Sequence, residues 1–410
     1  MKRLIIILFL SCSSLLFANT IIVGKDQLVT SLSKAVALAN SDDTILLKKG
    51  IYKEGNIVIN KPLRIIGIDQ PILDGENKYE ILTVSGRRII IKGIHFRNSG
   101  FSSMNDYASI KIIDAQDVII ENNTIDHSYF AIHVANSQNA IISNNVITGS
   151  AKTEQGSGNG VHLWKCNNII VEDNNVQGHR DGIYFEFVTN SFIQNNNSHN
   201  NIRYGLHFMF SNNDSYVGNT FNNNGAGVAV MFSHHVLMHG NTFEYNWGAS
   251  AYGLLLKEIS DSHIINNHFT KNTIAILMEG TNRIIINSNV FSNNGWAARV
   301  QASCVDNEFH HNNFLGNTFD VATNGTMMMN RFYSNYWDKY EGYDMDKNKV
   351  GDIPYHPVSM YSMVVEQNPN SLILLRSFMV SLLDKAEKAI PSFTPENLVD
   401  EQPYMKPLAL

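Results

Sequence analysis

One short asparagine motif recurs ten times along this chain, and it limits the possible folds more than any other feature. The motif is an asparagine, any residue, and then usually Ile or Phe. By subtraction of positions, the gaps between motifs are 22, 30, 22, 22, 22, 26, 22, 18 and 23 residues. A repeat of roughly 20–50 residues is typical of stacked-repeat proteins. The motifs begin at Asn123, Asn145, Asn175, Asn197, Asn219, Asn241, Asn267, Asn289, Asn307 and Asn330.

Each repeat contains short stretches in which apolar and polar residues alternate. Residues 171–176 and 182–185 form one such unit, and residues 192–197 and 205–208 form the next. Alternation over three to five residues predicts half-buried strands, while Gly and Asn suit the sharp corners between them. Three short strands and three corners in about 22 residues predict an all-β, single-stranded, right-handed parallel β-helix. Asparagines stacked at one corner can hydrogen-bond along the solenoid as an amide ladder.

Both ends of the solenoid carry predicted helical segments. Residues 30–39 read as a short amphipathic helix with a Ser/Thr start, which we expect to cap the first coil. Residues 371–390 form a helical run, and its apolar part is too short to span a bilayer. The resulting division is a signal peptide at 1–18, a parallel β-helix at 19–335, a Trp/Tyr/Asp-rich segment at 336–368 and a helical docking tail at 369–410.

The first residues predict export from the cytoplasm. Lys2 and Arg3 precede an apolar run at 5–10 and a small-residue cleavage pattern at 16–18. Charged residues make up 17% of the chain and the net charge is −6. This balance argues against a nucleic-acid or anionic-membrane partner held by a basic surface.

The two cysteines of the exported chain, Cys166 and Cys304, are expected to stay unpaired. Six solenoid steps separate their coils, which is roughly 29 Å at ~4.8 Å per step. A disulfide requires Cα atoms within about 7 Å of each other.

Sugar-cleaving chemistry is not predicted. Such enzymes need paired carboxylates or a basic residue near acidic metal ligands. Residues 178–181 (Gly-His-Arg-Asp) are the nearest cluster, and we expect them at a corner without partners. Glu186 and Glu279 lie several coils apart. The chain is therefore predicted not to be an enzyme, although a polysaccharide-binding or polysaccharide-cleaving β-helix stays open as the alternative.

A soft-metal site is the more specific hypothesis. Strand alternation turns His133, His162, Tyr184 and His207 outward, with Trp164, Glu186, Met209 and Met231 two residues further on. Equal offsets from Gly205 and Gly227 place Met209 and Met231 on adjacent coils, where two thioethers suit copper(I). An apolar surface for a protein partner, or histidines satisfied at corners, stays open as the alternative. The candidate copper ligands are Met209, Met231, His234, His235 and His239.

A second metal hypothesis concerns residues 344–352. Asp344, Asp346 and Asn348 resemble the start of a calcium loop, and Asp352 could add a later ligand. Lys349 stands where the EF-hand pattern has Gly, and Tyr355 where it has Glu. The candidate site is Ca²⁺ on these four residues, and a metal-free network of Asx-turns is the alternative.

The segment after the last repeat resembles a known family. Asn335-x-Trp337-x-x-Tyr340-x-Gly342-Tyr343-Asp344-x-Asp346 is followed by Gly351-Asp352-x-Pro354-Tyr355. Together these motifs are similar to the signature of the NosD family, and the resemblance continues through 374–377 and 400–407. Lys349 departs from the Gly usual in that family, which weakens the calcium hypothesis.

The resemblance implies a periplasmic, non-catalytic accessory role in the maturation of nitrous oxide reductase. Implied partners are a membrane permease and a cytoplasmic ATPase in an ABC-type complex, a copper chaperone, and the reductase whose copper–sulfur centre is assembled. The chain would then be associated with the inner membrane through partner proteins, with copper(I) bound transiently. The tail is predicted to dock a partner or, alternatively, to cap the solenoid. Its candidate contact residues are Arg376, Phe378, Met379, Tyr404 and Met405.

Overall fold

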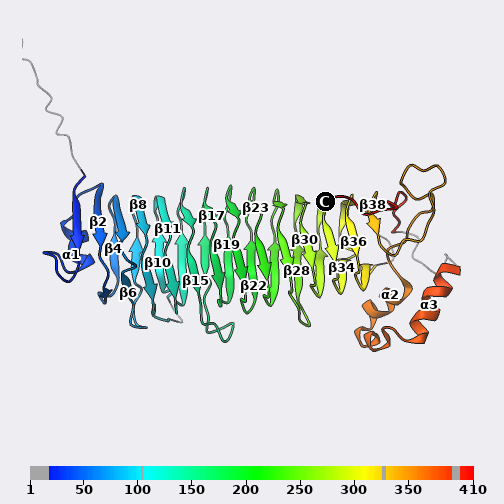
Figure 1. The fold of residues 1–410 in the computed structure, drawn as a ribbon, viewed down its shortest axis with the longest axis horizontal. Helices are drawn as coiled ribbons and strands as arrows, with labels where there is room; N and C mark the ends of the chain where they lie inside the picture. The colour runs from blue at the N-terminus through cyan, green and yellow to red at the C-terminus, as the bar shows by residue number, and fades with distance from the viewer. Residues whose placement is uncertain (1–17, 103–104, 326–328, 390–397) are drawn as a thin grey trace, which may run out of the picture.

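A computed structural model describes residues 18–102, 105–325, 329–389 and 398–410. The predicted signal peptide lies outside the described residues, except for Ala18. The described chain forms a long rod in which one strand after another winds around a common axis (Figure 1). Every strand pairs in parallel with the strands of the coils before and after it, so the predicted parallel β-helix is confirmed.

Three parallel sheets, which we call A, B and C, run the length of the rod. Sheet A has 14 strands: β1 Thr20–Val23, β2 Asp43–Leu47, β5 Leu63–Gly67, β8 Arg87–Lys92, β11 Gln116–Glu121, β14 Ile141–Ser143, β17 Ile170–Glu172, β20 Phe192–Gln194, β23 Ser215–Val217, β26 Leu237–His239, β29 Ser260–Ile265, β32 Asn282–Asn287, β35 Val305–His310 and β38 Met329–Tyr333.

Sheet B has 13 strands: β3 Ile51–Tyr52, β6 Ile72–Asp74, β9 His95–Arg97, β12 Thr124–Asp126, β15 Val146–Thr148, β18 Asn175–Gln177, β21 Asn197–His199, β24 Thr220–Asn222, β27 Thr242–Glu244, β30 His268–Thr270, β33 Val290–Ser292, β36 Asn313–Leu315 and β39 Tyr336–Trp337.

Sheet C has 12 strands: β4 Ile57–Ile59, β7 Leu82–Val84, β10 Ala108–Ile113, β13 Phe130–Ala135, β16 Val161–Trp164, β19 Asp181–Glu186, β22 Tyr204–Met209, β25 Ala226–Met231, β28 Tyr252–Lys257, β31 Ile274–Glu279, β34 Trp296–Val300 and β37 Phe319–Ala322.

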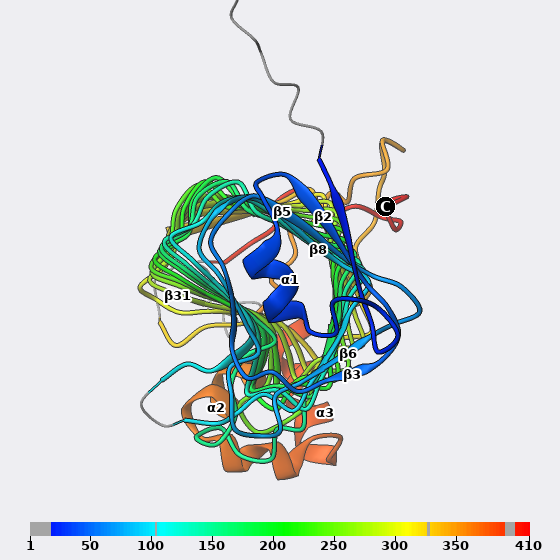
Figure 2. The ribbon, with the colours of Figure 1, turned by 90° about the vertical axis from the view of Figure 1, so that its left-hand side faces the viewer.

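Helices lie at the two ends of the rod. Helix α1 (Leu32–Leu38) covers the open end of the first coil, as the view along the axis shows (Figure 2), and buries Leu32, Ala35 and Val36. The predicted cap helix is thus confirmed. At the other end lie α2 (Met360–Gln367), the 3₁₀ helix η1 (Pro369–Leu374) and α3 (Phe378–Ala389). Among the described residues, no helix has the length and apolarity to cross a bilayer.

A ladder of buried asparagine side chains joins the coils at one corner. Asn219 is representative: its amide nitrogen donates to the Ile193 carbonyl at 2.8 Å and to Asn241 Oδ1 at 3.0 Å. Its own oxygen accepts from the backbone and the side chain of Asn196. Each rung therefore satisfies backbone groups that the corner would otherwise leave unpaired. The rungs are Asn123, Asn145, Asn174, Asn196, Asn219, Asn241, Asn267, Asn289, Asn312 and Asn335.

Four of the ten asparagines that mark the sequence motif stand outside this ladder. Asn175 and Asn197 lie in strands of sheet B, and their side chains bond each other at 3.1 Å. Asn307 and Asn330 bond each other at the start of sheet A strands. A second buried ladder, which the motif did not reveal, precedes the strands of sheet C. It runs through Asn201, Asn224, Asn246, Asn272, Asn294 and Asn317.

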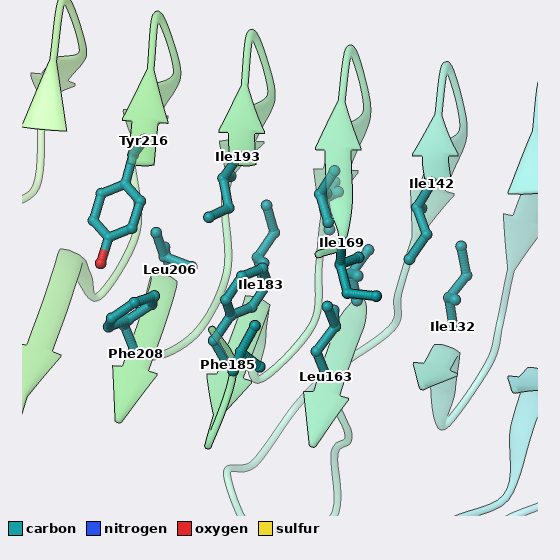
Figure 3. Packing of buried hydrophobic residues seen from close by; sticks show 14 of the residues in the cluster. Ile132, Ile142, Leu163, Ile169, Ile183, Phe185, Ile193, Leu206, Phe208 and Tyr216 are labelled. Atoms are coloured by element: carbon teal, nitrogen blue, oxygen red, sulfur yellow. The ribbon is translucent and has the colours of Figure 1, made fainter. Parts of the chain in front are cut away.

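The interior is filled by inward-facing aliphatic and aromatic side chains that stack coil upon coil (Figure 3). One column begins with Phe221 and Phe243, whose ring centroids lie 5.5 Å apart. It continues through Phe269, Phe291 and Phe314 and ends on Trp337, 4.0 Å from Phe314. Cys166 and Cys304 are buried and unpaired, as expected.

A segment that follows the last coil closes the amide ladder. Asp400 is completely buried, and its Oδ2 accepts from the backbone and side chain of Asn335 and from Trp337 Nε1 at 2.9 Å. A carboxylate suits this position because it is an acceptor without a donor that would need a further rung. Residues 398–410 therefore belong to the solenoid, whereas α2, η1 and α3 stand beside it.

We predict that Asn219→Ala lowers the free energy of unfolding by about 3 kcal/mol, because the Ile193 carbonyl and the Asn196 backbone N–H lose buried partners. Urea denaturation measures the change. Asn223→Gly is the control: Asn223 is exposed with a φ of 51°, a conformation that Gly adopts easily. Equal losses in both variants would contradict a structural role for the ladder.

We predict that Asp214→Asn raises the melting temperature increasingly between pH 4 and pH 8. Asp214 Oδ1 accepts from Ser191 N, while buried Oδ2 has no partner, and burial raises the pKa of this carboxyl to about 8. The folded state therefore keeps a proton that the unfolded state releases above its ordinary pKa near 3.8. The stability of the parent protein falls as the pH rises through this window, and the variant lacks this loss. Calorimetry at several pH values tests it; a constant difference between the proteins would contradict it.

Candidate functional site

The outer face of sheet C carries a column of imidazole and phenol rings. Cα register places His133, His162, Tyr184 and His207 on successive strands β13, β16, β19 and β22. Successive ring centroids lie 4.8, 4.6 and 4.9 Å apart. We call these four residues the histidine column. Strand alternation predicted this outward column, and the structure places its members in the same order.

Burial favours the neutral form of two members of the histidine column, His133 and His162. Burial lowers the pKa of His133 to about 4, and burial together with the neighbouring His133 lowers the pKa of His162 well below its usual value. Burial raises the pKa of Tyr184 to about 12. His133 Nδ1 and His207 Nε2 are buried without a hydrogen-bond partner. Neutral imidazole is the form that binds metal ions, so the chemistry of the column suits a soft or borderline cation.

A buried ion pair adjoins the column. Asp181 is fully buried and accepts from Arg203 Nε at 2.8 Å, while Arg203 also contacts His207 Nδ1 at 3.1 Å. Burial alone would raise the pKa of Asp181, but hydrogen bonds from His207 and Arg203 outweigh it and leave that pKa below the usual value. The expectation that Asp181 has no partners is wrong. Repeat spacing contained the signal, because Arg203 follows Asp181 by 22 residues.

Met209 and Met231 lie next to each other at the carboxyl ends of two neighbouring strands of sheet C. They are Cα partners on β22 and β25, which sets their backbones ~4.8 Å apart. Both side chains are half-buried, and the Tyr184 hydroxyl lies 4.0 Å from the Met209 sulfur. Glu186 precedes them in the same row and Lys257 follows. We call Met209 and Met231 the thioether pair.

The structure does not gather all five candidate copper ligands. His234 and His235 are exposed at the corner after β25, and their Nδ1 atoms lie 2.7 Å apart. His239 ends β26 in sheet A, where its Nε2 contacts Asn266. Within the described ranges, no three His, Cys, Asp or Glu side chains converge as a metal-binding group. Of the five candidate copper ligands, Met209 and Met231 are the two that the structure places on neighbouring strands in register.

Residues 344–352 form an exposed loop in which carboxylates bind backbone N–H groups. Asp344 accepts from Asn348 N and Lys349 N, and Asp346 also accepts from Asn348 N at 3.1 Å. Asp352 accepts from Met345 N at 2.7 Å. This is the arrangement of an Asx-turn network. The four candidate calcium ligands lie together in this loop, and Ca²⁺ binding stays a prediction.

The candidate partner-binding residues lie in two places. Arg376, Phe378 and Met379 are exposed at the junction of η1 and α3. Tyr404 and Met405 instead lie in the segment that closes the solenoid: Tyr404 N donates to the Asn335 carbonyl at 2.8 Å and Met405 N to Lys349 O. The two groups belong to different structural elements and do not form one contiguous tail helix.

A cavity of about 170 Å³ is lined in part by residues 150–158, a loop within the 30-residue gap between two repeats. Phe101 and Tyr129 form one wall, with ring centroids 4.8 Å apart, and the loop residues 156–158 line another side. His179 also lines it, fully enclosed and with Nε2 unpartnered. The cavity is smaller than the roughly 300–1,000 Å³ typical of small-molecule sites.

Fold and surface together define a rod-shaped β-solenoid with ordered columns of side chains, and imidazoles and thioethers lie on the outer face of one sheet. A sequence model described as periplasmic copper-binding protein (NosD) matches residues 18–198 and 143–343. The chain belongs to the NosD family. The matched ranges together cover all the solenoid strands, from β1 to β39.

Two curated relatives carry the description "probable ABC transporter binding protein NosD". The protein from Pseudomonas aeruginosa is 27% identical over 172 residues, which cover 38% of this chain and 40% of the relative. The protein from Stutzerimonas stutzeri is 27% identical over 124 residues, which cover 30% of this chain and 28% of the relative. The chain thus spans two fifths or less of the length of these relatives.

Solved structures share the fold at low sequence identity. The surface adhesin PfbA of Streptococcus pneumoniae is 13% identical with a TM-score of 0.53, over 74% of this chain and 85% of the adhesin. The lacto-N-biosidase of Eubacterium ramulus is 12% identical with a TM-score of 0.50, over 77% of this chain and 67% of the enzyme. Identities this low show the β-helix fold alone.

We predict that the Met209→Leu/Met231→Leu double variant binds copper(I) at least ~10-fold more weakly than the parent protein, because Leu keeps the volume and removes the soft sulfur. Competition with a chromogenic cuprous chelator under anaerobic conditions measures the affinity. Met345→Leu, at a methionine that is 77% exposed in a distant loop, is the control. Unchanged copper affinity in the double variant would remove the thioether pair as a site.

Proposed function

We propose that this chain is the periplasmic component of an ABC-type complex that serves assembly of the copper–sulfur centre of nitrous oxide reductase. Membership of the NosD family over residues 18–343 is the observation that carries the proposal. The family description as periplasmic and copper-binding and the relatives' descriptions as ABC transporter binding proteins agree with it. A copper chaperone and the reductase are the further partners in this proposal.

The role proposed for the solenoid is a non-catalytic docking platform. The outer face of sheet C holds imidazoles and thioethers in fixed register, and Asp181 is engaged by Arg203 and His207. A carboxylate bound in this way is held as an ion and gives no support to a general acid at neutral pH. In this proposal copper(I) is a transient cargo on the thioether pair, and Ca²⁺ in residues 344–352 has a structural role.

The C-terminal helices support partner binding because apolar side chains point away from the solenoid. Ile373 in η1 is 88% exposed and Phe378 in α3 is 82% exposed. Further exposed apolar side chains lie near them in sequence, at Leu372, Leu374, Leu375, Met379 and Leu382. Exposed apolar patches of this kind typically mark protein or membrane contacts. The permease of the ABC complex is the proposed occupant.

The same helices are anchored to sheet C. Tyr361 and Val365 of α2 and Val380 of α3 pack on Phe319 of β37, the last strand of that sheet. Arg299 of β34 forms an ion pair with Glu366 of α2. A displacement of these helices by the permease would therefore act directly on the sheet that carries the thioether pair.

The competing function is binding or cleavage of a polysaccharide, which the open cavity lined by Phe101 and Tyr129 favours. Incubation of the purified protein with alginate, pectate and similar polymers, followed by product analysis, separates the two functions. Turnover of any of these polymers would support an enzyme and contradict the docking platform.

We predict that a Phe378→Ser/Met379→Ser variant no longer captures the permease from detergent-solubilised membranes of the source organism. Both side chains are exposed on α3, so the substitutions remove apolar contact area and leave the solenoid folded. Leu28→Ser is the matched control, since Leu28 is fully exposed at the opposite end of the rod. Permease capture by the double variant at the parental level would contradict docking through these helices.

A further inference from the structure

Three phenylalanines on successive coils adopt a backbone conformation that bulky residues rarely adopt. Phe187, Phe210 and Phe232 follow directly after β19, β22 and β25, with φ angles of 55°, 48° and 55°. In this left-handed region Gly and Asn are common, and a bulky residue is an outlier. Left-handed outliers of this kind cluster at functional sites. We call these three residues the phenylalanine row.

Other coils place residues suited to the conformation at the same corner. Equivalent positions are those that directly follow the last residue of a sheet C strand. Asn136 and Lys165 precede the row, and Glu258 and Gly280 follow it, all with positive φ. The corner itself therefore does not need an aromatic side chain. Phenylalanine at this corner in three consecutive coils therefore needs an explanation other than the stability of the fold.

The phenylalanine row is also exposed. The three side chains are 44%, 39% and 40% exposed, and their rings stack nearly parallel with centroids 5.3 and 5.0 Å apart. Both faces of the Phe210 ring are covered by its neighbours, so the row offers ring edges to solvent. Glycans stack on aromatic faces, and the row leaves only the outer faces of its two end rings for such stacking, which makes a sugar a poor match. The corner residues at either end, Lys165 and Glu258, have opposite charges, unlike the basic flanks of a membrane-binding surface. A protein surface is the occupant that fits exposed aromatic edges.

The thioether pair identifies the chemistry of that protein. Met209 and Met231 immediately precede Phe210 and Phe232, so the sulfur atoms and the aromatic edges belong to the same rim of sheet C. Two thioethers supply only part of the coordination of a copper(I) ion and leave the rest open to ligands of a second molecule. His234 and His235 lie exposed two and three residues beyond Phe232. A partner seated on the row would bring its own soft ligands next to this pair.

We propose that the phenylalanine row is the docking edge for a copper(I)-carrying protein, which it positions so that the ion passes to Met209 and Met231. The inference rests on the proposed function, because it names the place where the copper-carrying partner binds. The row supplies recognition, and the thioether pair supplies the metal contact. The left-handed backbone belongs to the corner of every one of these coils, whereas the aromatic side chains contribute nothing that the corner requires.

The test compares the parent protein with a Phe187→Asn/Phe210→Asn/Phe232→Asn triple variant. The probe is the purified copper chaperone of the source organism, in its copper(I)-loaded and metal-free forms, measured by biolayer interferometry. We expect at least ~10-fold weaker binding of both forms by the triple variant. Its melting temperature is expected to equal or exceed that of the parent, because Asn tolerates the left-handed conformation, as Asn136 does in an equivalent coil.

Two further variants sharpen the result. Phe192→Thr removes a phenylalanine that is 49% exposed on β20 of sheet A, and should bind like the parent. Met209→Leu/Met231→Leu should keep the affinity for the metal-free chaperone and lose the additional affinity that copper(I) confers. Parental binding by the triple variant, a lowered melting temperature of that variant, or absence of binding to the parent protein would each overturn the inference. Capture of the permease by the triple variant shows whether the proposed function survives such a result.

Discussion

The hydrogen bond between asparagine amides of neighbouring coils is the interaction on which the rest of this structure depends. Each amide uses its donor on the next rung and on a backbone carbonyl, and its acceptor on the preceding rung. Corner positions are thereby fixed, while the connecting segments vary in length. The gaps of 30 and 26 residues, which contain the two long loops, leave the rungs Asn145–Asn174 and Asn241–Asn267 bonded at 2.9 and 3.0 Å. Side chains one repeat apart consequently align into columns on the surface.

Sequence periodicity predicted the fold and the outward columns, because both follow from the repeat length and strand alternation. It could not decide which asparagine of a pair points inward: Asn174 and Asn175 recur with the same period, and only Asn174 is a rung. The partners of Asp181 were missed because residues 178–181 were assigned to a corner, whereas Asp181 begins β19. The phenylalanine row could not be recognised, because backbone φ is not visible in a sequence and alternating phenylalanines normally indicate core positions.

Sheet C links the candidate metal-binding residues to the C-terminal helices. In its strand order β25, which carries Met231, is four positions from β37, on which α2 packs. Four strand spacings of ~4.8 Å make a separation of roughly 19 Å. Because every coil is joined to the next by strand pairing and by two amide ladders, this separation is stiff. A partner bound at the helices and a partner bound at the phenylalanine row would therefore be held at a fixed distance from each other.

The contact of Asp400 with the last rung of the ladder decides whether one end of the rod is closed. Asp400 belongs to residues 398–410, so the stack is sealed by a segment that is synthesised after all of the solenoid strands. Without that segment, Asn335 and Trp337 would present unpaired donors beside a bare sheet edge, the kind of surface on which strands of other molecules add. A copy of the chain that lacks this segment would thus aggregate through one end of the rod and be open to proteases there. Only molecules that contain residues 398–410 would remain monomeric rods.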